Sequence, residues 1–164
     1  MKVAILSDIH DNVWTLATLL DGLEAEELIF CGDFCAPFTL RQIAEAFAGP
    51  IHVVFGNNDG DQLLLAHVAA RFEHVTLHGH FAELELGGRQ VAITHYPEIA
   101  KALARGGTYD LVCHGHSHER VVKRHGRTLR VNPGEVMGRL GAPTYAIYDT
   151  ETGEAEIVDV KRDT

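Results

Sequence analysis

The first half of the chain alternates short apolar runs with longer stretches in which apolar residues recur at helical spacing. Each apolar run has the length of a buried strand and is followed by one helical stretch. Strands are predicted at residues 3–6, 27–31 and 51–55, and helices at residues 13–23, 40–47 and 64–72. Three strand–helix repeats predict a parallel sheet joined by right-handed crossovers.

The second half of the chain changes to pairs of strands joined by glycine-containing turns. Such pairs are predicted at residues 81–86 with 90–94, 120–123 with 128–131, and 144–148 with 155–160. A further strand is predicted at residues 111–114, and Pro97 in a first helical turn indicates a helix over residues 97–105. We therefore expect one α/β domain over residues 1–164, folded as a four-layer α-β-β-α sandwich with two mixed sheets.

Charge and composition narrow the classes of partner and compartment. The 164 residues carry a formal net charge of −9, which argues against binding to long nucleic acid, because such binding needs a basic face. No apolar run approaches the roughly 20 residues of a membrane-spanning helix, and the first residues do not resemble a signal peptide. Three cysteines are too few for a disulfide scaffold. We therefore expect a cytoplasmic protein with no membrane partner.

Polar clusters follow five of the predicted strands. They are Asp8-Ile9-His10, Gly32-Asp33, Gly56-Asn57-Asn58-Asp59, Thr94-His95 and the His-Gly-His-Ser-His run at 114–118. Ligands of parallel α/β sheets bind beyond the carboxyl ends of the strands, so these clusters are expected to converge in space. Most of the 11 histidines lie near glycine or a carboxylate, which indicates a metal site.

The residue types in these clusters indicate two metal ions. Two carboxylates, one amide and four imidazoles are the candidate ligands: Asp8, His10, Asp33, Asn57, His95, His116 and His118. Seven ligands are too many for one tetrahedral site and suit two ions that share a ligand, for which the Asp33 carboxylate is our candidate. The nitrogen-rich set favours Mn²⁺, with Ni²⁺, Fe or Zn²⁺ as alternatives, over Ca²⁺.

These motifs, in this order along nearly the whole chain, resemble those of the calcineurin-like metallophosphoesterases. The chain length and the Asn132-Pro133-Gly134 stretch resemble the small prokaryotic branch of YfcE-like phosphodiesterases. The resemblance implies a first metal ion held by Asp8, His10 and His118, and a second held by Asn57, His95 and His116. It also implies that Asp33 bridges the two ions.

Further roles follow from the same resemblance. Asn12 and Asp59 are expected to orient ligands or phosphate. Catalytic roles are expected at Asn58, Asp59, His95 and His116.

Three positions depart from the common pattern of the family. Asn58 stands where many relatives have a histidine that is thought to serve the leaving group, and an amide has no useful acid pKa. Tyr96 stands where glycine is common, and its ring is expected to narrow the pocket or to stack on a substrate base. Glu135 stands where serine is more usual, and its carboxylate is expected to disfavour dianionic monoesters. Together with Asn12, these three residues are the expected substrate contacts.

The expected function is that of a binuclear-metal phosphoesterase that hydrolyses phosphodiesters by attack of a metal-bridging hydroxide. Metal ions lower the pKa of bound water to about 7, so hydroxide is available at neutral pH. The expected partner is a small phosphate-ester substrate, and the terminal strands offer a sheet edge that could support a homodimer. Two alternatives stay open: a phosphomonoesterase with the same metal site, and a non-catalytic interaction scaffold on the same fold.

Overall fold

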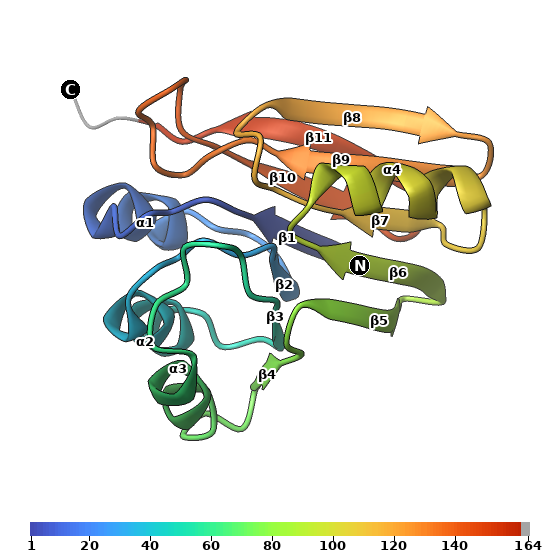
Figure 1. Cartoon of the computed structure of the whole chain (residues 1–164). Coiled ribbons are helices and arrows are strands. Elements are labelled where there is room, and N and C mark those ends of the chain that lie inside the picture. Colours follow the sequence, from blue (N-terminus) through green and yellow to red (C-terminus); the bar gives the residue numbers. More distant parts are fainter. Residues whose placement is uncertain (162–164) are drawn as a thin grey trace.

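Two β-sheets lie face to face in the computed structural model, which describes residues 1–161, and helices cover their outer faces (Figure 1). The first sheet has six strands in the order β11-β10-β1-β2-β3-β4, and the second has five in the order β5-β6-β7-β9-β8. Both sheets contain parallel and antiparallel pairs. The predicted α/β sandwich with two mixed sheets is therefore confirmed.

The first sheet is built on the strand–helix repeats of the N-terminal half. Its strands are β1 (Lys2–Leu6), β2 (Glu27–Phe30), β3 (Ile51–Val53), β4 (Val75–Leu77), β10 (Thr144–Asp149) and β11 (Glu154–Asp159). The first four run parallel, and β10 pairs antiparallel with both β1 and β11. Its outer face is covered by α1 (Val13–Asp21), α2 (Pro37–Ala46) and α3 (Gln62–Ala69).

The second sheet comes from the C-terminal half. Its strands are β5 (Phe81–Leu86), β6 (Arg89–Thr94), β7 (Leu111–Cys113), β8 (Arg120–His125) and β9 (Thr128–Pro133). The three central strands β6, β7 and β9 run parallel, and β5 and β8 pair antiparallel at the two edges. Its outer face is covered by α4 (Pro97–Gly106), which packs through Ala100 and Ala104.

The alternation of side chains along β1 explains why its sequence is apolar throughout. Val3 and Ile5 point into the core between the two sheets, whereas Ala4 and Leu6 point toward the helices. Successive residues of a strand face opposite sides, so a strand between two layers has no solvated face. Burial on both faces thus holds the central strands in place between the layers, and their carboxyl ends are held rigidly.

The structure differs from the predicted elements mainly where the elements are short. β4 is not predicted, because three residues are too few to show a periodicity; its pairing with β3 makes it a strand. α3 ends at Ala69, and Phe72 packs against the core from the segment that follows the helix. Within residues 1–161, no helix combines the length and the apolar character that crossing a bilayer requires.

Candidate metal centre

Five loops meet where the parallel strands β1, β2 and β3 of the first sheet and β6 and β7 of the second reach their carboxyl ends. The loops carry all seven predicted ligand residues: Asp8, His10, Asp33, Asn57, His95, His116 and His118. Polar contacts join these side chains into one cluster. The expected convergence at the sheet edge is what the structure shows.

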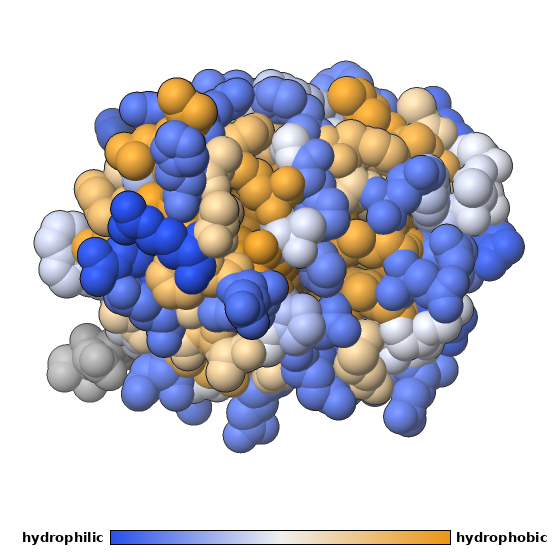
Figure 2. All heavy atoms as spheres, turned by 90° about the horizontal axis from the view of Figure 1, so that it is seen from below, coloured by the Kyte–Doolittle hydropathy of each residue, from blue (hydrophilic) through white to orange (hydrophobic). Residues whose placement is uncertain are grey.

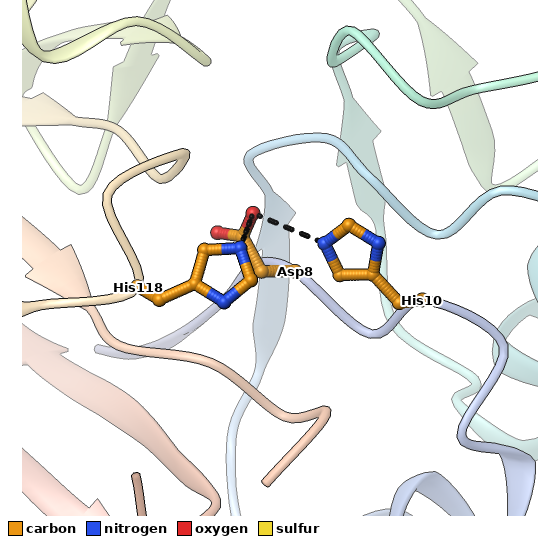
Figure 3. A group of neighbouring side chains, drawn as sticks. All are labelled: Asp8, His10 and His118. Carbon is orange, nitrogen blue, oxygen red and sulfur yellow. Dashed lines mark ion pairs between the residues drawn. The ribbon is translucent and has the colours of Figure 1, made fainter. Parts of the chain in front are cut away.

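One part of the cluster consists of Asp8, His10 and His118, whose candidate ligand atoms all lie within 4.8 Å of one another. Both imidazoles approach the same carboxylate oxygen of Asp8 (Figure 3). The distance to Asp8 Oδ1 is 3.3 Å from His118 Nε2 and 3.7 Å from His10 Nε2. Two nitrogens and one oxygen therefore face a common point.

The second part of the cluster consists of Asn57, His95 and His116. The side-chain oxygen of Asn57 lies 2.9 Å from His95 Nε2 and 2.9 Å from His116 Nδ1. His95 is fully buried, whereas Asn57 and His116 are exposed. This part of the cluster is thus open to solvent and accessible to a substrate.

Asp33 lies between the two parts. Its Oδ2 atom is 3.5 Å from His10 Nε2 and 3.4 Å from His95 Nε2, so one carboxylate oxygen contacts a residue of each part. Asp8, Asp33 and His95 also form a second group whose ligand atoms lie within 4.8 Å of one another. This is the position that a shared carboxylate ligand requires.

Two atoms of the cluster are buried without a hydrogen-bond partner. In the described part of the chain, only Asp8 Oδ1, His10 Nε2 and the Tyr148 hydroxyl are side-chain polar atoms in this condition. Unsatisfied buried polar atoms are costly and are rare in folded proteins. A divalent cation bound to Asp8 Oδ1 and His10 Nε2 would satisfy both atoms at once, so the residues fit the metal site that the sequence predicts.

The backbone of the ligand loops is strained. Five of the seven candidate ligands have a positive φ between 45° and 69°: Asp8, His10, Asp33, His116 and His118. This left-handed region is uncommon for residues other than glycine, and such strain gathers at functional sites, where the surrounding structure enforces it. The two sheets thus hold these side chains in positions that a relaxed loop would not adopt.

Two glycines let the loops approach closely. A Cβ atom on Gly56 would lie 2.1 Å from Asp33 Oδ1, and one on Gly115 would lie 1.8 Å from Ser7 Oγ. These distances are far inside van der Waals contact. Glycine is therefore required at both positions for Asp33 and Asp8 to sit where they do.

The charges of the cluster stabilise one another. Burial alone would raise the pKa of the Asp8 carboxyl group, but the His10 and His118 imidazoles hold this pKa well below its usual range. The nearby Asp8 carboxylate in turn raises the pKa of His118 to about 9. At His95, burial lowers the pKa of the imidazole. The neighbouring Asp33 carboxylate acts in the opposite direction, and the net shift of the pKa is upward. A metal cation would bind these same groups in place of the protons that they carry.

The outer ring nitrogens of three histidines also have partners. His95 Nδ1 lies 2.7 Å from the Cys31 carbonyl oxygen, and His118 Nδ1 lies 2.7 Å from Glu135 Oε2. His10 Nδ1 lies 3.7 Å from the Cys35 thiol sulfur. In all three residues Nε2 is the nitrogen that faces the cluster. Partners of this kind orient a histidine ring for metal binding.

Two of the expected substrate contacts, Glu135 and Asn12, have partners within the protein. Glu135 is 1% exposed, and its carboxylate accepts from the backbone N–H groups of Leu140 and Gly141 in addition to contacting His118. The Asn12 side chain caps α1 by accepting from the Thr15 N–H, and its amide donates to the Met137 carbonyl. The polar atoms of both side chains are thus engaged within the protein.

Asp59, which is expected to orient ligands or phosphate and to serve catalysis, contacts the backbone of the ligand loops. Its buried carboxylate accepts hydrogen bonds from the backbone N–H groups of Asp33, Cys35 and Gly56. Burial raises the pKa of Asp59, although these three donors oppose the shift. The side chain therefore ties two ligand loops together.

Asn58 and Tyr96, the other expected substrate contacts, lie at the cluster. Asn58 is exposed and donates to both Asp33 oxygens, from its backbone N–H and from its side-chain amide. The Tyr96 ring is half-buried, with its centroid 5.3 Å from that of His95 and 5.5 Å from that of His116. Tyr96 thus forms a wall beside Asn57, His95 and His116.

Other residues support the site although the sequence does not predict them as parts of it. The Ser7 hydroxyl donates to Asp8 Oδ2 at 2.6 Å, and the Asn132 amide donates to the Gly115 carbonyl and the Ser117 hydroxyl. Asn132 thereby pins the loop that carries His116 and His118. A serine before an aspartate and an asparagine before a proline are too common to be recognised as parts of a site.

Comparison with known proteins agrees with this geometry. Residues 1–153 match the family model of the calcineurin-like phosphoesterase superfamily domain. The phosphodiesterase MJ0936 of Methanocaldococcus jannaschii is 33% identical over 160 residues, which cover 94% of this chain and 96% of that relative. A solved structure of an archaeal phosphodiesterase is similar with a TM-score of 0.88 and 31% identity, over 97% of this chain and 99% of that one.

More distant structures share the fold alone. The phosphoesterase Yfce from E. coli has a TM-score of 0.68 and 22% identity, over 98% of this chain and 100% of that one. Vps29 from Entamoeba histolytica, complexed with Zn²⁺, has a TM-score of 0.68 and 19% identity over the same shares of the two chains. The family predicted from the sequence motifs is confirmed: the chain belongs to the calcineurin-like phosphoesterase superfamily.

Proposed function

We propose that this chain is a divalent-metal-dependent phosphodiesterase. The observation that carries the proposal is the pair of buried, unpartnered atoms, Asp8 Oδ1 and His10 Nε2, inside a cluster of seven ligand-type side chains. The 33% identical relative is itself a phosphodiesterase, which supports the same reaction class here. A metal centre that acts on a phosphoester substrate would explain why these side chains are gathered in one cluster.

The ligand assignment follows the two parts of the cluster. Asp8, His10 and His118 would hold one ion, Asn57, His95 and His116 would hold the other, and Asp33 would contact both. We propose Mn²⁺ as the ion, with Ni²⁺, Fe or Zn²⁺ as alternatives, because imidazole and carboxylate ligands suit these metals. When bound, two such ions would supply positive charge for phosphate oxygens and would lower the pKa of water toward neutrality.

The side chains of the chain itself orient and select the substrate. Asn57 and His116 are exposed at the open part of the cluster, and the Tyr96 ring limits that opening on one side. Asn58 occupies the position next to Asp33, and an amide cannot donate a proton to a leaving group. We therefore propose that the enzyme favours phosphodiesters whose leaving group departs without a general acid.

The partners follow from the charge of the chain. A net charge of −9 opposes binding to long nucleic acid, whereas a cationic metal centre attracts a small phosphate ester. We propose a small phosphodiester as substrate and the cytoplasm as location. β11 is an edge strand of the first sheet, and an unpaired edge of this kind supports the proposal of a homodimer.

The test compares two chromogenic esters, bis-p-nitrophenyl phosphate and p-nitrophenyl phosphate, with and without chelator and added Mn²⁺. We expect hydrolysis of the diester that chelation abolishes and Mn²⁺ restores, with slower hydrolysis of the monoester. Faster hydrolysis of the monoester would identify a phosphomonoesterase with the same metal site. Full activity after exhaustive chelation would overturn the metal-dependent function.

A second candidate is an interaction scaffold, favoured by the large apolar side chains that the surface exposes. Trp14 is 79% exposed, Leu140 is 73% exposed and Leu63 is 69% exposed. On the face seen in Figure 2, however, hydrophobic residues are interspersed with hydrophilic ones. Stoichiometric metal without hydrolysis of either ester would favour the scaffold.

A further inference from the structure

Glu135 places a buried carboxylate behind the proposed metal ligand His118. Its Oε2 atom lies 2.7 Å from His118 Nδ1, on the side of the ring opposite to Asp8. Its Oε1 atom accepts from the Leu140 N–H at 2.6 Å and from the Gly141 N–H at 2.5 Å. Glu135 is 1% exposed, so its carboxylate is stabilised by these three contacts and not by solvent.

These contacts fix the orientation of the His118 ring. A carboxylate can only accept, so the ring nitrogen facing it, Nδ1, carries a proton. In the neutral ring, the lone pair is then on Nε2, the atom that lies 3.3 Å from Asp8 Oδ1. The ring thus presents a ligand lone pair to the point where Asp8 Oδ1 and His10 Nε2 lack partners.

The two parts of the cluster differ in this respect. His95, in the second part, has the neutral Cys31 carbonyl behind its Nδ1, and His116 is exposed. A carboxylate partner increases the basicity of a histidine ligand more than a neutral carbonyl does. Within residues 1–161, only the part formed by Asp8, His10 and His118 has a carboxylate behind a histidine ligand in this way.

We propose that Glu135 is a positioning residue that fixes His118 and makes the Asp8–His10–His118 site the tighter of the two metal sites. The inference rests on the metal-dependent function proposed above. Glu135 also ties this site to the loop at residues 138–142 through Leu140 and Gly141, so the metal ligand and the loop are held by one side chain. Through its contact with His118, Glu135 orients a metal ligand, which a carboxylate that only binds substrate would not do.

The test is a calorimetric titration of the metal-free protein with Mn²⁺. We expect two binding steps in the wild type, and Glu135→Gln is expected to weaken the tighter step by roughly 10- to 100-fold while leaving the weaker step unchanged. Glu119→Gln is the matched control: it removes a charge next to His118 in sequence, and Glu119 is exposed and makes no side-chain hydrogen bond or ion pair within residues 1–161. Unchanged affinities in Glu135→Gln, or an equal loss in both steps, would overturn the inference.

Two further measurements separate this role from a purely structural one. In a His118→Ala background, Glu135→Gln is expected to have no further effect on Mn²⁺ binding, because its action passes through His118. In the wild type loaded with Zn²⁺, nitrogen NMR of the histidine rings is expected to find the His118 proton on Nδ1. A proton on Nε2 would contradict the inference even if the Glu135 variants do not fold.

The outcomes also distinguish this inference from the proposed function. If Mn²⁺ binding responds as expected but neither ester is hydrolysed, the phosphodiesterase proposal fails and the role of Glu135 stands. If the diester is hydrolysed with Mn²⁺ and Glu135→Gln binds Mn²⁺ like the wild type, the phosphodiesterase proposal stands and the proposed role of Glu135 fails.

Discussion

Asn58 donates two hydrogen bonds to Asp33, one from its backbone N–H to Oδ1 and one from its side-chain amide to Oδ2, each 2.8 Å long. The side chain at position 58 is thus within reach of the carboxylate at the centre of the cluster. A change of this side chain leaves the backbone hydrogen bond in place, so its chemistry can be varied without releasing Asp33.

The first prediction concerns this position. Asn58→His replaces the amide by an imidazole that can give a proton to a leaving group. We expect the ratio of monoester to diester hydrolysis to rise, which parallel assays with p-nitrophenyl phosphate and bis-p-nitrophenyl phosphate would measure. Asn58→Ala, which removes the amide without adding an acid, is the control. An equal ratio in both variants would show that the imidazole supplies no acid.

The second prediction concerns Asp33 itself. Asp33→Ala removes a carboxylate that contacts both His10 and His95, so we expect loss of at least one metal ion per chain and a fall in diester hydrolysis of more than roughly 100-fold. Metal analysis and the diester assay measure the two effects. Asp61→Ala, which removes the N-cap of α3, is expected to lower stability by about 1 kcal/mol and to keep both metal ions. Near-normal activity of Asp33→Ala would disprove the shared-ligand assignment.

The third prediction compares two glycines. Gly115→Ala would place a methyl group 1.8 Å from Ser7 Oγ and 2.5 Å from Asp8 Oδ2, and we expect a loss of roughly 1–3 kcal/mol in the free energy of unfolding. Gly106→Ala adds the same methyl group at the end of α4, where no atom lies within 4 Å, and is expected to be neutral or slightly stabilising. Urea unfolding of the two variants measures the difference. Equal stability would mean that the loops of Ser7 and Asp8 yield to the added methyl group.

The fourth prediction concerns metal removal. A divalent ion that binds the native protein and not the unfolded chain is expected to raise the free energy of unfolding. The gain is about 2.7 kcal/mol per site at a metal concentration of about 100 times Kd. Thermal unfolding with and without Mn²⁺, after chelation, measures this gain as a rise in Tm. The metal-free protein is expected to stay folded, because its apolar clusters do not include the ligands. A Tm independent of Mn²⁺ would exclude a native-state metal site.

The sequence by itself determined the layer architecture and predicted the candidate ligand residues. Apolar runs such as residues 3–6 and 27–31 can only be buried between two layers, and the turn residues at Gly87-Gly88 and Gly126 mark the strand pairs. The polar residues that end such buried strands must lie at one sheet edge, which is why Asp8, Asp33 and His95 could be grouped without a structure.

Only the tertiary structure decided which partners surround those ligands. β4 exists because it pairs with β3, and Glu135 contacts His118 because β9 and the loop after β7 lie side by side. The engagement of Asn12 and Asp59 within the protein likewise depends on loops that are distant in sequence. Residue types and their spacing along one strand are local properties, whereas hydrogen-bond partners across loops are set by packing, which no local pattern encodes.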